Sequence, residues 1–196
     1  MRIAGGLLAL CALATIACTA MIYASLKPIP AWRHPLVLPG YLLFALLTGG
    51  LPMLGATWPR GPGPEGALPW LLAAIALALA ALKLAYWQGI DRAPLPQTRG
   101  DAVGLPRRQT SVFERPHTEA NYVTREMAFA VARRHSLALR IAALLLFALL
   151  PLLCLPAWWH GAGWAVPLAT AGGLAGAFLE RWLFFAQARH LVTLYY

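Results

Sequence analysis

The segment from Phe113 to Phe129 gathers many ionisable groups within an otherwise apolar chain. It contains His117, three glutamates and two arginines. Imidazole and carboxylate side chains are common ligands of zinc and common general acids and bases. The segment is therefore a candidate for a metal site, an active site or a docking surface for another protein.

The spacing of these residues argues against a metal centre. A zinc protease helix carries two histidines at positions i and i+4, so that both imidazoles converge on the ion. His117 and Glu119 stand at i and i+2, and His135 lies much further along the chain. The pattern favours the solvated start of a helix with mixed charges, available for contact with a partner. An intramembrane enzyme that acts through His117 and Glu119 is the alternative.

Other redox and nucleophilic motifs are also missing from the sequence. The cysteines lie in apolar runs and form no Cys-x-x-Cys pair, so they supply no ligand set for zinc or an iron–sulfur cluster. The other histidines fall near the ends of apolar runs, whereas a membrane haem needs imidazoles that face each other at depth. The sequence therefore predicts a non-catalytic chain that binds no metal or cofactor directly. The residues considered are Cys11, Cys18, Cys154, His34, His135, His160 and His190.

Lys83 lies inside an apolar run, where a charged side chain is costly and often functional. It is followed closely by Tyr86 and Trp87, which have the character of an aromatic belt at a membrane surface. A lysine side chain is long enough to reach such a surface while its stem stays in hydrocarbon. We therefore expect Lys83 to extend to the membrane interface.

A later apolar run carries the adjacent charges Glu180 and Arg181. We expect them to pair with neighbouring groups near the end of this run, and Glu180 could alternatively form part of a proton or quinol path. Gly172 and Gly176 precede them with the small-xxx-small spacing that is typical of closely packed membrane helices. This run therefore combines a helix-packing motif with a candidate intramembrane functional pair.

Composition decides what kind of element must position these residues. The chain of 196 residues is 60% hydrophobic and 12% charged, whereas soluble domains carry about 25% charged residues. Its mean hydropathy is +0.62, and several apolar runs reach the length of about 20 residues that a membrane helix needs. The sequence predicts an all-α, polytopic helical membrane protein.

Hydropathy predicts about five transmembrane helices and one long basic loop. We favour a retained first helix over a signal peptide, because its apolar run is longer than the usual 7–15 residues. The chain would then divide into three helices (1–87), an extramembrane loop (88–136), and two helices with a tail (137–196). The expected helices cover approximately 3–25, 36–57, 69–87, 137–158 and 163 to beyond 180.

The long loop changes character along its length. Its first half, "DRAPLPQTRGDAVGLPRRQ", is rich in proline, glycine and arginine and predicts irregular structure. Beyond Thr118 the apolar residues recur at helical spacing, which predicts a short amphipathic helix. Positive charge gathers on this side of the membrane, at Lys27, Arg33, eight arginines of the loop and Arg189. The positive-inside rule therefore predicts that the loop is cytoplasmic.

Three separate stretches of the chain suggest a family. They read "CTAMIYASLKPIPAWRHPLVLPGYLLF", "FERPHTEANYVTREMAFAVARRH" and "ERWLFFAQARHLVTLYY". Together they resemble the DmsC family, the membrane-anchor subunit of dimethyl sulfoxide reductase. The similarity extends over essentially the whole chain and corresponds to the last five of the family's usual eight spans.

The resemblance implies a role in anaerobic respiration at the bacterial inner membrane. In such a complex the anchor holds an iron–sulfur subunit and a molybdopterin catalytic subunit, and it draws electrons from quinol, typically menaquinol. The family's histidine-bearing quinol loop lies in the part that this chain does not match, so no quinol ligand is assigned. A fragment and a shortened anchor are both compatible with this pattern.

The resemblance also gives the charged segment a role as a docking face for the partner subunits. Paired charges in such an interface provide orientation and specificity. A small transporter or channel is the alternative, although the sequence offers few of the broken helices typical of one. The expected docking residues are Lys27, Arg33, His117, Glu119, Tyr122, Arg125 and Glu126.

Overall fold

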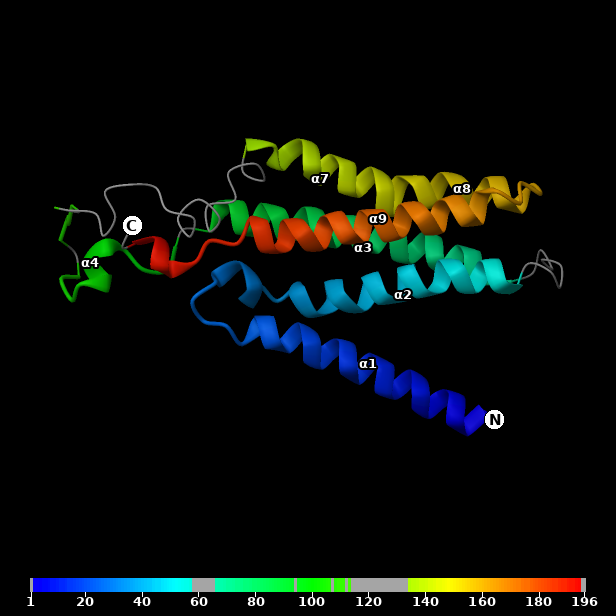
Figure 1. Ribbon diagram of the computed structural model, residues 1–196, viewed down its shortest axis with the longest axis horizontal. Helices are drawn as coiled ribbons and strands as arrows, with labels where there is room; N and C mark the ends of the chain where they lie inside the picture. The colour runs from blue at the N-terminus through cyan, green and yellow to red at the C-terminus, as the bar shows by residue number, and fades with distance from the viewer. Residues whose placement is uncertain are drawn as a thin grey trace.

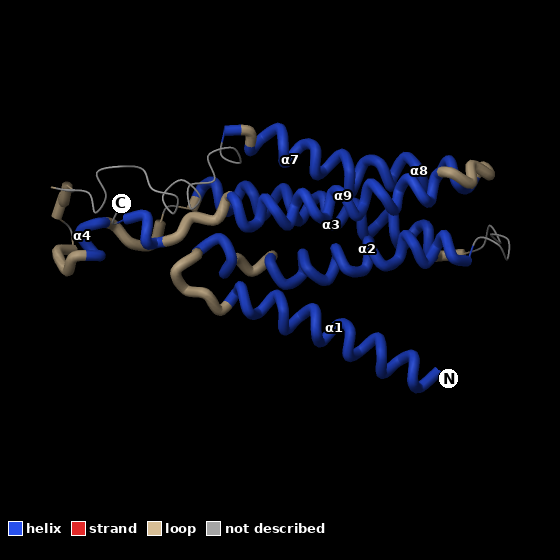
Figure 2. Tube along the Cα trace, in the orientation of Figure 1, coloured by secondary structure: helices blue, strands red, loops and turns tan. Residues whose placement is uncertain are grey.

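The computed structural model of the chain is built from helices. It describes residues 2–57, 66–93, 95–106, 108–111, 113 and 134–194. Within these ranges every regular element is a helix, and no strand occurs (Figure 2). The predicted all-α class is confirmed. The helix predicted after Thr118 lies outside the described residues.

Four helices are long and apolar enough to cross a membrane, as judged by length and composition. At a rise of about 1.5 Å per residue, each can span a hydrocarbon core of about 30 Å. The predicted polytopic membrane class is therefore confirmed. The helices are α1 (Arg2–Ala24), α2 (Val37–Thr57), α3 (Leu68–Arg92) and the continuous run from Ser136 to Trp159.

The fifth predicted span corresponds to α9 (Ala165–Ala186). This helix has 22 residues and packs against α2 and against the run from Ser136 to Trp159. It is not among the four helices that meet the length and composition test, because Glu180 and Arg181 lower its apolar character. The helix was therefore predicted correctly, but its composition alone does not define it as a span.

The run from Ser136 to Trp159 changes its hydrogen-bond pattern in the middle. It consists of α7 (Ser136–Leu144), a π-helical turn η3 (Leu145–Leu149) and α8 (Leu150–Trp159). Pro151 follows this turn directly, and proline has no N–H to donate and crowds the carbonyl four residues earlier. A wider turn accommodates that proline without ending the helix.

One end of the bundle gathers segments that lie far apart in the sequence (Figure 1). The connection between α1 and α2, the last turn of α3, the first turn of α7 and the last turn of α9 all lie there. Within the described residues, three short helices accompany them, and a hydrogen bond from Leu191 N–H to Pro28 O ties the tail to the α1–α2 connection. We call this the polar end. The short helices are η1 (Pro30–Arg33), α4 (Arg99–Ala102) and η4 (Leu191–Leu194).

One boundary of the predicted loop and one element inside it differ from the prediction. Helix α3 continues to Arg92 rather than ending at Trp87, so five more residues are helical. The expected irregular half contains α4, where Thr98 and Asp101 form reciprocal capping hydrogen bonds. These bonds hold the pKa of the Asp101 carboxyl below its usual value. A capping pair within a proline-rich stretch is enough to nucleate one helical turn.

Helix α9 approaches η3 and α8 closely at its glycines. A Cβ atom at Gly176 would lie 2.5 Å from the backbone nitrogen of Phe147, and one at Gly172 would overlap the side chain of Leu150. The glycines thus lie where the two backbones nearly touch. The small-xxx-small spacing is located at this contact.

Helix α1 is held mainly at its carboxyl end. Its residues from Ile3 to Thr15 are exposed, whereas Ala20 is buried and Tyr23 packs among the rings of Trp32 and Phe184. The helix diverges from α2 toward its amino terminus (Figure 1). The packing that fixes α1 is therefore concentrated next to η1.

Candidate functional site

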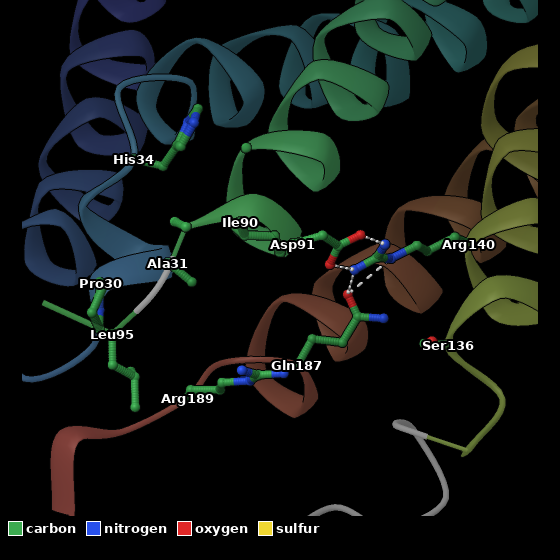
Figure 3. A pocket seen from close by; sticks show the side chains of 12 residues that line it. Pro30, Ala31, His34, Ile90, Asp91, Leu95, Ser136, Arg140, Gln187 and Arg189 are labelled. Carbon is green, nitrogen blue, oxygen red and sulfur yellow. Dashed lines mark hydrogen bonds and ion pairs between the residues drawn. The ribbon is translucent and has the colours of Figure 1, made fainter. Parts of the chain in front are cut away.

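A cavity of about 510 Å³ opens at the polar end of the bundle. Its walls come from η1, α3, α7 and the chain after α9, together with the connection that follows α3 (Figure 3). Segments distant in sequence thus contribute to one site, which we call the polar-end pocket. Its lining residues are Pro30, Ala31, His34, Gly89, Ile90, Asp91, Ala93, Leu95, Ser136, Arg140, Gln187 and Arg189.

Arg140 organises one wall of the pocket. Its guanidinium donates to both carboxylate oxygens of Asp91, at 2.5 and 2.9 Å, and to Oε1 of Gln187 at 3.0 and 3.2 Å. Figure 3 shows the three side chains converging from α7, α3 and the end of α9. A bidentate arginine–carboxylate pair fixes orientation as well as charge. Arg140 therefore links α7 to α3 and to the end of α9 at the polar end.

Gln187 also offers the pocket an unused donor. Its Nε2 is buried and has no hydrogen-bond partner within the described part of the chain. A buried N–H without an acceptor is costly, so this group is available to donate to a molecule bound in the pocket. The pocket thus combines a polar wall at Arg140 and Gln187 with an apolar wall of Pro30, Ala31 and Ile90.

His34 lies on the opposite wall in its neutral form. Its Nδ1 accepts a hydrogen bond from the Leu36 N–H at 3.2 Å, which an imidazolium could not do. Burial and, secondarily, the charge of Lys83 lower the pKa of His34. A Cβ atom on Gly89 would lie 2.6 Å from His34 Nε2, so the ring fits against α3 only because residue 89 is glycine.

Acidification is expected to destabilise the fold through His34. Because the pKa of His34 is below its usual 6.5 in the folded chain, the unfolded chain binds this proton more readily. The stability that the neutral His34 ring gives to the folded chain is fully present above pH 6.5. It is lost as the pH falls toward the pKa of His34 in the folded chain. NMR titration of labelled histidine should place the pKa of His34 below 6.5. His34→Gln should reduce the loss of unfolding free energy on acidification, and a His34 pKa above 6.5 would contradict this assignment.

A buried ion cluster lies deeper in the bundle. Lys83 and Glu180 form an ion pair with side chains only 3% and 0% exposed, and Arg181 bonds to the same carboxylate at 2.5 and 2.7 Å. The prediction that Lys83 reaches the membrane surface is wrong. Glu180, on a helix distant in the sequence, provides a partner that a single-helix pattern does not reveal.

Aromatic rings enclose the cations of this cluster. The Lys83 ammonium lies 4.0 Å from the ring centroid of Tyr86, and the Arg181 guanidinium lies 4.2 Å from that of Tyr41 and 4.7 Å from that of Phe184. Cations gain stabilisation from such ring faces, more so when desolvated. The ions and the rings around them therefore form one packed cluster at the interface of α2, α3 and α9.

The predicted docking residues that the structure describes lie neither in the polar-end pocket lining nor in the ion cluster. Lys27 and Arg33 are exposed at the polar end, on the connection between α1 and α2. Among the described residues, no group of three or more histidine, cysteine or acidic side chains could hold a metal. The remaining predicted docking residues lie outside the described ranges, namely His117, Glu119, Tyr122, Arg125 and Glu126.

The fold and the site define a polytopic helical membrane protein with an ionic pocket at one end. No protein-family model and no solved structure matches the chain. The chain is 31% identical over 191 residues to a sulfite dehydrogenase subunit of Allochromatium vinosum. The alignment covers 94% of this chain and 57% of that relative, so the chain spans little more than half of the relative's length.

The comparison supports the general part of the predicted family role. The relative is, by its name, a subunit of an enzyme that oxidises sulfite. This chain is therefore similar to a subunit of a redox enzyme. The more specific assignment to the anchor of dimethyl sulfoxide reductase stays a prediction.

Proposed function

We propose that this chain is the membrane subunit of a multi-subunit oxidoreductase and exchanges electrons between a quinone pool and soluble redox subunits. The observation that carries the proposal is the similarity to the sulfite dehydrogenase subunit along 94% of the chain. The soluble partners would be an iron–sulfur subunit and a molybdopterin catalytic subunit, and the membrane would be the bacterial inner membrane.

The polar-end pocket is the proposed site for the quinone head group. Ligand pockets are commonly apolar with a few well-placed polar groups. Pro30, Ala31 and Ile90 offer an apolar wall. On the other side Gln187 brings an unused hydrogen-bond donor, and Arg140 brings a guanidinium held by Asp91 and Gln187. The pocket lies at one end of the membrane helices, where a lipid-soluble ring can enter and a soluble electron acceptor can approach.

The direction of electron flow is set by the soluble subunits. A dehydrogenase of sulfite would deliver electrons to quinone, whereas the resemblance to DmsC implies withdrawal of electrons from menaquinol. Purification of a tagged chain from its native host, after gentle solubilisation, tests the assembly. We expect molybdenum, iron and two larger subunits in the eluate. A chain that purifies without metal or partners would contradict the proposal.

Reversal of charge at Lys27 and Arg33 is expected to release the partner subunits. Both side chains are exposed, on the connection at the polar end, so reversing their charge should leave the buried core of the bundle intact. Lys27→Glu combined with Arg33→Glu should lower the co-purified molybdenum at least several-fold while the membrane chain stays abundant. His160→Glu, at the opposite end, is the control. Equal molybdenum recovery from both variants would place the docking face elsewhere.

A further inference from the structure

The ion cluster lies directly behind the wall of the polar-end pocket. Lys83, Tyr86, Trp87 and Ile90 recur at helical spacing on one face of α3, and Ile90 lines the pocket. The same spacing runs along α9 to the residue that follows it, and that residue, Gln187, lines the pocket; the residues are Glu180, Leu183, Phe184 and Gln187. The faces of α3 and α9 that bury the ions therefore extend toward the polar end, where they form part of the pocket wall.

A single layer of aromatic rings separates the ions from the pocket. The Tyr86 ring packs edge-on against His34, with centroids 5.3 Å apart, and the Lys83 ammonium lies 4.0 Å from its centroid. The Tyr86 hydroxyl donates to Ala31 O at 3.3 Å. The Trp87 ring lies 5.4 Å from Lys83 Nζ and 5.3 Å from the Arg140 guanidinium. Charges separated by apolar matter interact more strongly than charges separated by water. The field of the cluster therefore reaches the pocket.

That field is positive. One carboxylate, Glu180, serves the two cations Lys83 and Arg181, so the cluster carries an excess of one positive charge. The Arg181 Nη1 atom is buried without a hydrogen-bond partner among the described residues.

The pocket itself adds to this positive charge. Asp91 neutralises Arg140, Arg189 is an exposed cation, and His34 is neutral. Together the described groups in and behind the pocket comprise four cations and two carboxylates.

We propose that the Lys83–Glu180–Arg181 cluster makes the polar-end pocket selective for an anionic ring ligand, the deprotonated form of a hydroxyl-bearing quinone. Gln187 Nε2 donates to a ring oxygen, and the cluster supplies the charge that favours its ionised form. Lys83, Glu180 and Arg181 act through the field and do not touch the ligand. The choice of a quinone rests on the proposed function, whereas the preference for an anion rests on the charges.

Two probes of similar shape separate charge from shape. 2-Hydroxy-1,4-naphthoquinone is an anion at neutral pH, and 2-methyl-1,4-naphthoquinone is neutral. Their dissociation constants would be measured on the purified full chain, with its partners where they co-purify. We expect the anion to bind about tenfold more tightly than the neutral ring, the ratio that corresponds to about 1.4 kcal/mol.

Charge variants give opposite expectations. Lys83→Met leaves Glu180 paired with Arg181, and Arg181→Met leaves Glu180 paired with Lys83. Each removes one positive charge and should abolish most of the anion preference. Arg181→Lys should retain it, and Glu180→Gln should increase it. Leu79→Met, one turn from Lys83 in the buried face, is the uncharged control.

Each outcome has a distinct meaning. Anion preference that is lost in Lys83→Met and Arg181→Met but kept in Arg181→Lys supports the inference, even if Glu180→Gln does not fold. Equal binding of both probes to the wild type, or equal weakening of both in the variants, overturns the inference and leaves the quinone site standing. Failure of both probes to bind overturns the quinone site together with the inference.

Discussion

Replacement of Glu180 by leucine is expected to lower the free energy of unfolding by about 3–5 kcal/mol. The substitution leaves the Lys83 ammonium, which is 3% exposed, without its carboxylate partner. Aromatic contacts with Tyr86 stabilise the cation only in part. The loss is therefore dominated by an uncompensated charge within an apolar helix bundle.

Unfolding of the purified chain by a denaturing detergent, titrated into a mild one, would measure this change. The informative control is the double variant Lys83→Met with Glu180→Leu. It removes the two fully buried charges. Arg181 loses its carboxylate partner, but its side chain is 27% exposed and keeps its contacts with the rings of Tyr41 and Phe184. We expect the double variant to recover most of the lost stability. A single variant as stable as the wild type would show that the ion pair does not hold α3 to α9.

Gly176→Ala is expected to destabilise the chain by about 1–3 kcal/mol, although alanine is the better helix former. The added Cβ would lie 2.5 Å from Phe147 N and 2.8 Å from Phe147 Cβ. Backbone atoms cannot move aside as a flexible side chain can, so α9 must separate from η3.

Gly49→Ala provides a matched control for this substitution. Gly49 also lies inside a helix, but a Cβ atom there meets nothing within 4 Å. The same chemical change should therefore leave stability unchanged or raise it by up to about 1 kcal/mol. The detergent titration used for Glu180 would compare the two. Equal effects at both positions would show that Gly176 is not at a close helix contact.

Composition and hydropathy were sufficient to predict the helical class and the approximate extent of the main helices. They reflect the solvent that each segment meets, which is a local property of the sequence. Two details of the helices were not predicted, because hydropathy reports apolar runs and not hydrogen-bond patterns. Helix α3 continues past its apolar run to Arg92, and Pro151 is accommodated by a π-helical turn rather than by a break.

The candidate site was much less predictable, because its contacts join residues on different helices. The aromatic residues that follow Lys83 in the sequence favoured a position at the membrane interface. The sequence pattern of this one helix gave no sign of the ion pair with Glu180. Asp91 and Arg140 lie far apart in the sequence, on α3 and α7, and only the folded arrangement of the bundle brings them together. The unusual positions of the charges within apolar runs were the available signal, and they indicated importance without identifying partners.

The uneven attachment of α1 links the pocket to the thickness of the surrounding bilayer. A helix responds to hydrophobic mismatch mainly by changing its tilt, and α1 is free to do so along its exposed amino-terminal half. Its anchored end leads within a few residues into η1, which carries Ala31 on the pocket wall. A membrane too thin or too thick for α1 would therefore pull first on the side of the pocket that holds Ala31 and His34.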